Sequence, residues 1–139
     1  MKTSTGLTLG QIYTRRDLRN MFSITDATIN NGHFKPRDHE SVWIFVTENK
    51  TPDRTPYADK LLGNELTTEG QLAGRTDSLI MEHEKHGLEL LVFHRMDRFQ
   101  HGGAGFRYEG TFRYLSSDGT RPRKFRLIRT VPNPLTTNS

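Results

Sequence analysis

The stretch Ser41–Thr47, SVWIFVT, is the clearest β-strand in the sequence. It is β-branched and aromatic, and polar residues bound it on both sides. A continuous apolar run is typical of a strand that is buried on both faces, so we expect this one at the centre of a sheet. Leu88–His94, LELLVFH, is a second run of the same kind and predicts a second buried strand.

The segments around these two runs predict shorter strands and two helices. Thr14 followed by Asp17 is close to a capping box and predicts a short helix over 15–22, while Thr76 or Asp77 begins a second helix that stops at Gly87. We expect loops at 49–56 and 96–105, a hairpin turn at 116–119, and further strands within 61–68, 106–115 and 124–130. The fold class that follows is α+β: a curved mixed sheet or open β-barrel with about two peripheral helices.

Length and composition predict one domain. The 139 residues fit a single core, which we place at 1–131 with a C-terminal tail at 132–139. The mean hydropathy of −0.72 indicates a large share of surface and loop. No apolar run reaches the roughly 18 residues of a membrane span, and no apolar segment at the N-terminus indicates a secretory signal. The absence of cysteine excludes disulfides and thiol catalysis. We therefore expect a cytoplasmic protein.

Positive charge is concentrated near the C-terminus. The net charge is +4, and from Phe106 onward seven Lys and Arg residues stand against two acidic ones. Such a distribution predicts a basic face that meets phosphates. A solvated arginine-rich surface explains it equally well.

The sequence offers little support for catalysis. His83 and His86 have helical ligand spacing but no third partner, and Gly102–Gly105 lacks the lysine and the following helix of a phosphate-binding loop. We predict no cofactor and no metal. One alternative stays open: Asp38, Glu48 and Lys50 mimic the acid, acid and lysine of a metal-dependent nuclease. Glu48 and Lys50 read equally well as a solvated strand end.

The polar loops after the first buried strand carry residues suited to a nucleobase. Tyr57 could stack on an unpaired base, Asp59 could accept a hydrogen bond from an exocyclic amine, and Gln71 could both donate and accept. Trp43 lies in the buried strand, which favours a place in the core. Arg75 and Asp77 could pair with each other, or Asp77 could cap the helix. These residues predict a pocket for a flat polar ligand, most simply a nucleobase.

The order of these segments resembles the SRA-like domains of modification-dependent restriction enzymes, in particular those at the C-terminal end of some restriction helicases and those fused to HNH nucleases. The resemblance covers roughly residues 10–130. The segments that carry it are Ile12–Arg15, Gly32–Pro36, Ile44–Glu48, Thr55–Lys60, Glu69–Gln71, Arg75–Asp77, His83 with Gly87, and Leu90–Phe93.

The resemblance implies a PUA-superfamily barrel that flips a modified cytosine, typically 5-methylcytosine or 5-hydroxymethylcytosine, into an aromatic-walled pocket. It implies a non-catalytic module of a restriction or defence system, with double-stranded DNA as its partner and any nuclease or helicase in a fused or associated domain. By position, the pocket residues would be Trp43, Tyr57, Asp59, Gln71 and Arg75. Contacts to the DNA backbone are expected from Arg15, Arg16, His33, Lys35, Arg37, Lys50, Arg107, Arg113 and Arg126.

Overall fold

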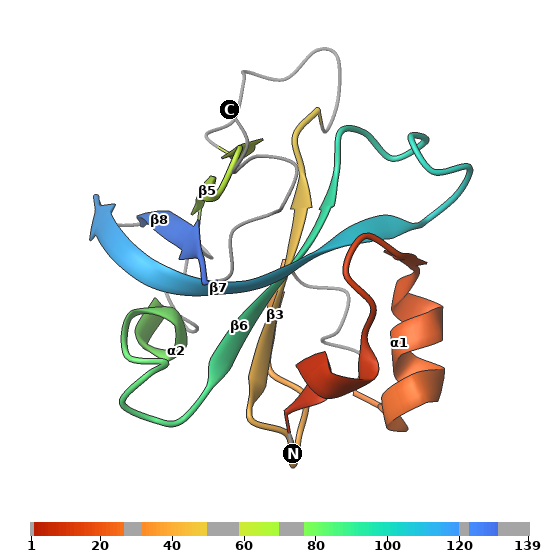
Figure 1. The fold of residues 1–139 in the computed structure, drawn as a ribbon, viewed down its shortest axis with the longest axis horizontal. Coiled ribbons are helices and arrows are strands. Elements are labelled where there is room, and N and C mark those ends of the chain that lie inside the picture. The colour runs from red at the N-terminus through yellow and green to blue at the C-terminus, as the bar shows by residue number, and fades with distance from the viewer. Residues whose placement is uncertain (1, 27–31, 50–58, 70–76, 120–122, 131–139) are drawn as a thin grey trace.

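The computed structural model describes residues 2–26, 32–49, 59–69, 77–119 and 123–130. In this part of the chain an eight-stranded sheet is accompanied by two α-helices and one short 3-10 helix (Figure 1). The predicted tail at 132–139 lies outside the described residues. In chain order the elements are η1 (Thr3–Gly6), β1 (Ile12–Tyr13), α1 (Arg15–Phe22), β2 (His33–Phe34), β3 (Ser41–Thr47), β4 (Lys60–Leu62), β5 (Glu65–Glu69), α2 (Asp77–Met81), β6 (Glu89–Arg95), β7 (Phe106–Asp118) and β8 (Lys124–Arg129).

The sheet is mixed and strongly curved. Its strand order is β2-β3-β6-β7-β8-β5-β4, with β1 added beside β7. Strands β3 and β6 are parallel, and the other pairs are antiparallel. His33 of β2 nevertheless meets Phe125 of β8 at 6.3 Å between ring centroids, so the sheet curls back on itself without closing between its described end strands. The predicted α+β class with a curved mixed sheet is confirmed.

Strand β3 begins and ends where the sequence predicts, and it organises two cores. Because successive side chains point to opposite faces of a sheet, Val42, Ile44 and Val46 pack into one cluster with β5, β8 and α2. Trp43 and Phe45 pack into a second cluster that includes residues of α1, β1 and β7. Both faces of β3 are therefore buried, as its continuous apolar sequence predicts.

Trp43 belongs to the second of these cores. Its side chain is 0% exposed, and its indole Nε1 donates a hydrogen bond to Thr3 Oγ1 at 2.9 Å. Its ring also contacts Phe22, Phe34 and Phe93. A fully enclosed ring has no face left for a ligand, so the structure corrects the assignment of Trp43 to a base pocket.

Two element boundaries differ from the prediction by more than one residue and change the length of their elements. β7 continues through the predicted hairpin turn to Asp118, because residues 116–118 pair with β8. A register shift between Tyr114 and Ser116 marks a bulge there, and bulges increase the local twist and bend of a strand. Helix α2 ends early, at Met81, and hydrogen-bonded turns lead from it to Gly87, which has the positive φ of 69° expected of a stop.

Among the residues that the structure describes, no helix is long and apolar enough to cross a membrane.

Candidate functional site

The parallel strands β3 and β6 end together, and polar residues gather at this end. Their arrowheads point the same way in Figure 1, and Thr47 pairs with Arg95 in the final position of the register. Side chains alternate between the two faces of a strand. Thr47 and Arg95 consequently lie on the face that α1 covers, while Glu48 and His94 lie on the opposite face.

Glu48 joins three strands. Its Oε2 atom lies 2.7 Å from His94 Nε2 of β6 and accepts a hydrogen bond from the backbone N–H of Leu61 in β4 at 3.1 Å. The side chains of Glu48 and His94 are each only 12% exposed. The interpretation of Glu48 as a solvated strand end is therefore wrong: it ties the β4–β5 hairpin to the centre of the sheet.

Replacing Glu48 by alanine should lower the free energy of unfolding by about 1–3 kcal/mol, the cost of leaving a buried donor without its partner. Here the Leu61 N–H and the imidazole of His94 both lose an acceptor. Urea denaturation followed by circular dichroism measures the change. Glu84→Ala is the matched control, because the side chain of Glu84 is 74% exposed. Equal stabilities of the two variants would contradict the bridging role.

Asp59 lies at the same end, immediately before β4. Its Oδ1 atom accepts hydrogen bonds from Thr68 Oγ1 at 3.1 Å and from the backbone N–H of Glu69 at 2.9 Å. The carboxylate is buried, with 7% of the residue exposed. Asp59 is thus oriented by the end of β5, and the Leu61–Glu48 bond holds this hairpin end beside the end of β3. Tyr57, Gln71 and Arg75, the other predicted pocket residues, lie outside the described residues.

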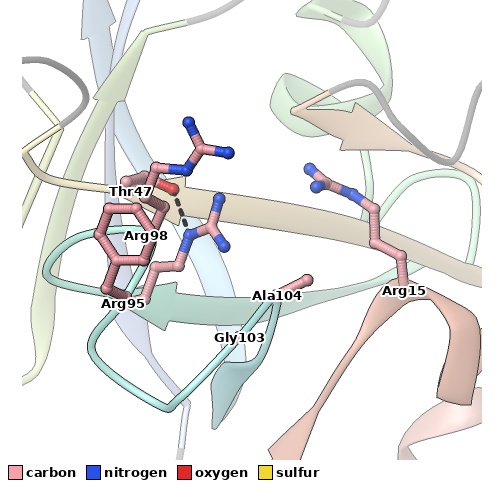
Figure 2. A pocket seen from close by; sticks show the side chains of 7 residues that line it. Arg15, Thr47, Arg95, Arg98, Gly103 and Ala104 are labelled. Carbon is pink, nitrogen blue, oxygen red and sulfur yellow. Dashed lines mark hydrogen bonds between the residues drawn. The ribbon is translucent and has the colours of Figure 1, made fainter.

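A cleft lined by arginines lies on the other face. Its cavity volume is about 550 Å³, and Figure 2 shows guanidinium groups extending into it from both sides. Arg15 is the first residue of α1, whose start is held by a capping box of Thr14 and Asp17. Arg95 donates from Nε to Thr47 Oγ1 at 2.8 Å. We call this the arginine cleft; its lining residues are Arg15, Thr47, Arg95, Arg98, Phe99, Gly103 and Ala104.

Aromatic rings hold the like charges of the arginine cleft together. The Cζ atom of Arg15 lies 4.4 Å from the ring centroid of Phe45 and 5.1 Å from that of Phe106, and Arg95 Cζ lies 4.1 Å from the Phe106 centroid. Cation–π contacts of this kind are attractive. Burial, with a contribution from Arg95, lowers the pKa of Arg15 to about 10. Burial and the charge of Arg98 also lower the pKa of Arg95.

Several predicted DNA-backbone residues are engaged elsewhere. His33 is 5% exposed, because the pairing of β2 with β3 directs its ring against Phe125; it offers little surface to a duplex, which argues against that prediction. Arg107 pairs with the buried Glu109 at 2.8 Å, and Arg126 pairs with Glu65 at 2.7 Å. Carboxylates therefore offset part of the basic charge predicted for the last strands. Arg126 is itself exposed, and so are four further predicted contacts: Arg16, Lys35, Arg37 and Arg113. Lys50 lies outside the described residues.

Arg95, Arg98 and Phe99 are not among the residues predicted from the sequence, in which 96–105 is expected to be a loop. The structure shows a hydrogen-bonded turn, in which Met96 N donates to Gln100 Oε1 at 2.6 Å and Phe99 N donates to Asp97 Oδ1 at 2.8 Å. This turn leaves Phe99 74% exposed. The sequence does contain a signal for these residues. Functional residues gather at the carboxyl ends of parallel strands, and Arg95–Phe99 (RMDRF) directly follows the predicted strand Leu88–His94.

The structure separates the acidic residues of the nuclease alternative. Asp38 precedes β3 and Glu48 follows it. The 7 residues of this strand span about 20 Å at ~3.3 Å per residue, so the two carboxylates cannot share one metal ion. Among the described residues, no group of three or more His, Asp or Glu side chains could hold a metal.

Known proteins resemble this chain in structure. No family model and no curated protein sequence matches it. Its fold is nevertheless SRA-like. It is similar to KRYPTONITE in complex with mCHG DNA and SAH (TM-score 0.63, 13% identity, 96% of this chain and 34% of that one). It is also similar to Arabidopsis thaliana SUVH6 in complex with SAM (TM-score 0.56, 17% identity, 93% of this chain and 27% of that one). A third similar structure is the modification-dependent TagI restriction endonuclease (TM-score 0.53, 17% identity, 89% of this chain and 50% of that one). The chain thus spans half or less of each of these proteins.

Proposed function

We propose that this chain is a DNA-binding module that recognises a modified base, 5-methylcytosine or 5-hydroxymethylcytosine, after the base has been flipped out of the duplex. The observation that carries this proposal is the fold shared with KRYPTONITE, whose structure holds mCHG DNA. Flipping costs a few kcal/mol of unstacking and unpairing, so the base needs a site that both stacks on it and reads its Watson–Crick edge.

The geometry around Asp59 supports such a site. Two hydrogen bonds from Thr68 and Glu69 orient its carboxylate before any ligand arrives, and a preorganised group loses less freedom on binding. A carboxylate accepts well from the exocyclic amine of cytosine. Tyr57 lies two positions before Asp59 in the sequence and Gln71 two positions after Glu69. We assign stacking to Tyr57, edge recognition to Asp59 and Gln71, and a supporting role to Arg75.

The module is proposed to act without catalysis of its own, within residues 1–131. TagI is a restriction endonuclease of which this chain covers half. By analogy, we assign any DNA cleavage to a fused or associated nuclease domain. The proposed setting is a cytoplasmic defence system, in which double-stranded DNA and a fused or associated nuclease or helicase are the partners of this chain. Cleavage of a duplex by the purified chain with Mg²⁺ would contradict this assignment.

Binding to matched duplexes tests the proposed function. Three duplexes of one sequence carry cytosine, 5-methylcytosine or 5-hydroxymethylcytosine at a single position, and fluorescence anisotropy at one salt concentration gives the affinity for each. We expect one modified duplex to bind more tightly than the unmodified duplex. Salt is held constant because phosphate contacts make every affinity salt-dependent. Equal affinity for all three would overturn the modified-base proposal.

A further inference from the structure

The arginine cleft has the chemistry of an anion site. Arg15 reaches it from the first turn of α1, and Arg95 and Arg98 reach it from the end of β6 and the turn that follows (Figure 2). Guanidinium groups present planar forks of N–H donors that match phosphate oxygens. The hydroxyl of Thr47 and the rings of Phe45 and Phe106 hold two of the three arginines in place.

Burial and neighbouring positive charge act together on the arginines of the cleft. Burial is the larger cause of the lowered pKa of Arg15, and the charge of Arg95 adds to it. Both effects mean that the protonated guanidinium is less stable here than in water. A bound phosphate would reverse the second effect by placing negative charge between the arginines. An anion should therefore be stabilised more by the arginine cleft than by an isolated arginine on the surface.

Phe99 adds a stacking surface at the rim of the cleft. It is 74% exposed, although a hydrogen-bonded turn holds it in place. The guanidinium of Arg98 lies over its ring at 5.3 Å. Arginine and an exposed aromatic ring side by side are the pair that single-stranded nucleic-acid sites use, one for the backbone and one for a base.

We infer that the arginine cleft binds a backbone phosphate of DNA through Arg15, Arg95 and Arg98, and that Phe99 stacks on a nucleotide next to that phosphate. The identity of the ligand rests on the proposed function. The cleft and Asp59 lie at the same end of the β3–β6 pair on opposite faces of the sheet. DNA that presents a base at Asp59 would therefore cross this end, and its backbone would pass the cleft.

The double variant Arg15→Gln/Arg95→Gln tests the phosphate contact. Its affinity for the unmodified duplex should fall about tenfold, and the slope of log affinity against log salt should lose about one unit of magnitude for each phosphate contact removed. The ratio of modified to unmodified affinity should not change. This test uses unmodified DNA, so its result does not depend on the preference for a modified base. A wild-type protein without that preference would refute the proposed function, but the effect of the double variant on DNA affinity could still be measured.

Lys85→Gln is the matched control. It removes one positive charge, as each of the two arginine substitutions does, from a residue that is 74% exposed and does not line the cleft. An equal loss of affinity in this control, or an unchanged salt slope in the double variant, would overturn the inference.

Arg98→Gln, at an exposed position of the turn, replaces the double variant in this test if the double variant does not fold. Its affinity for the unmodified duplex should fall less than that of the double variant, and its salt slope should also decrease. A thermal shift with inorganic phosphate, compared with chloride at equal ionic strength, identifies a free-phosphate site. A shift that the variants abolish, without any change in DNA affinity, would overturn the DNA assignment.

Phe99→Ala tests the stacking contact separately. We expect affinity for the duplex to fall about five- to tenfold, within the range of one base–aromatic contact. The salt slope should stay the same, because no charge is lost. An unchanged affinity would show that Phe99 takes no part in the site.

Discussion

Trp43→Ala is expected to lower the free energy of unfolding by about 3–5 kcal/mol, the usual cost of removing a large aromatic side chain from a core. The residue is completely buried among Phe22, Phe34, Phe45 and Phe93, and the substitution also leaves Thr3 Oγ1 without its indole donor. Domains are stable by only about 5–15 kcal/mol. The variant should therefore be close to unfolding at room temperature.

Urea denaturation monitored by circular dichroism measures this loss, since Trp43 is the single tryptophan and its fluorescence disappears with it. Trp43→Phe serves as the control: it keeps an aromatic ring in the core and loses the hydrogen bond to Thr3, so its cost should be smaller. A Trp43→Ala protein with normal stability but weakened DNA binding would refute the core assignment and return Trp43 to the pocket.

The elements with strong local signals could be predicted from the sequence. β3 was predicted to the residue because seven consecutive residues favour a doubly buried strand. Helix α1 was predicted because Thr14 and Asp17 form a capping box within one turn. The end of β7 was not predicted, because Ser116 to Asp118 have the composition of a turn. They form a strand nevertheless because they pair with β8, and their own local sequence does not indicate this pairing.

The residue types of the candidate site could be predicted from the sequence, but the positions of its side chains could be predicted only in part. Asp59 could be selected by residue type, and its orientation follows from the antiparallel register of β4 with β5. Glu48 was misread because its partners, His94 and Leu61, come from strands that only the tertiary fold brings beside it. Arg95 lies near Arg15 for the same reason: one ends a strand, the other begins a helix, and the tertiary fold brings both against Phe106.

Asp59→Ala is expected to remove the preference for a modified cytosine. A well-placed contact to a base edge is worth about 1–3 kcal/mol of discrimination, so the ratio of modified to unmodified affinity should fall toward one. The same change leaves the N–H of Glu69 and the hydroxyl of Thr68 without an acceptor, which should cost about 1–3 kcal/mol of stability. Recognition and folding are thus affected together in this variant.

Asp59→Asn separates the two effects. The amide keeps one acceptor oxygen for Thr68 and Glu69, so the hairpin end should stay intact, but it replaces the other oxygen by a donor that opposes the exocyclic amine of cytosine. The expected result is near-normal urea stability with the modification preference lost. Thr68→Val is the converse control, because it removes one hydrogen bond to Asp59 and leaves the carboxylate in place.

The salt dependence distinguishes this residue from the arginine cleft. Asp59 is proposed to contact a base and not a phosphate, so the slope of log affinity against log salt should be the same in wild type and in Asp59→Asn. The cleft variants should show the opposite pattern, with a changed slope and an unchanged preference. If Asp59→Asn retains the full preference for the modified duplex while Asp59→Ala only loses stability, Asp59 positions the β4–β5 hairpin and does not recognise the base.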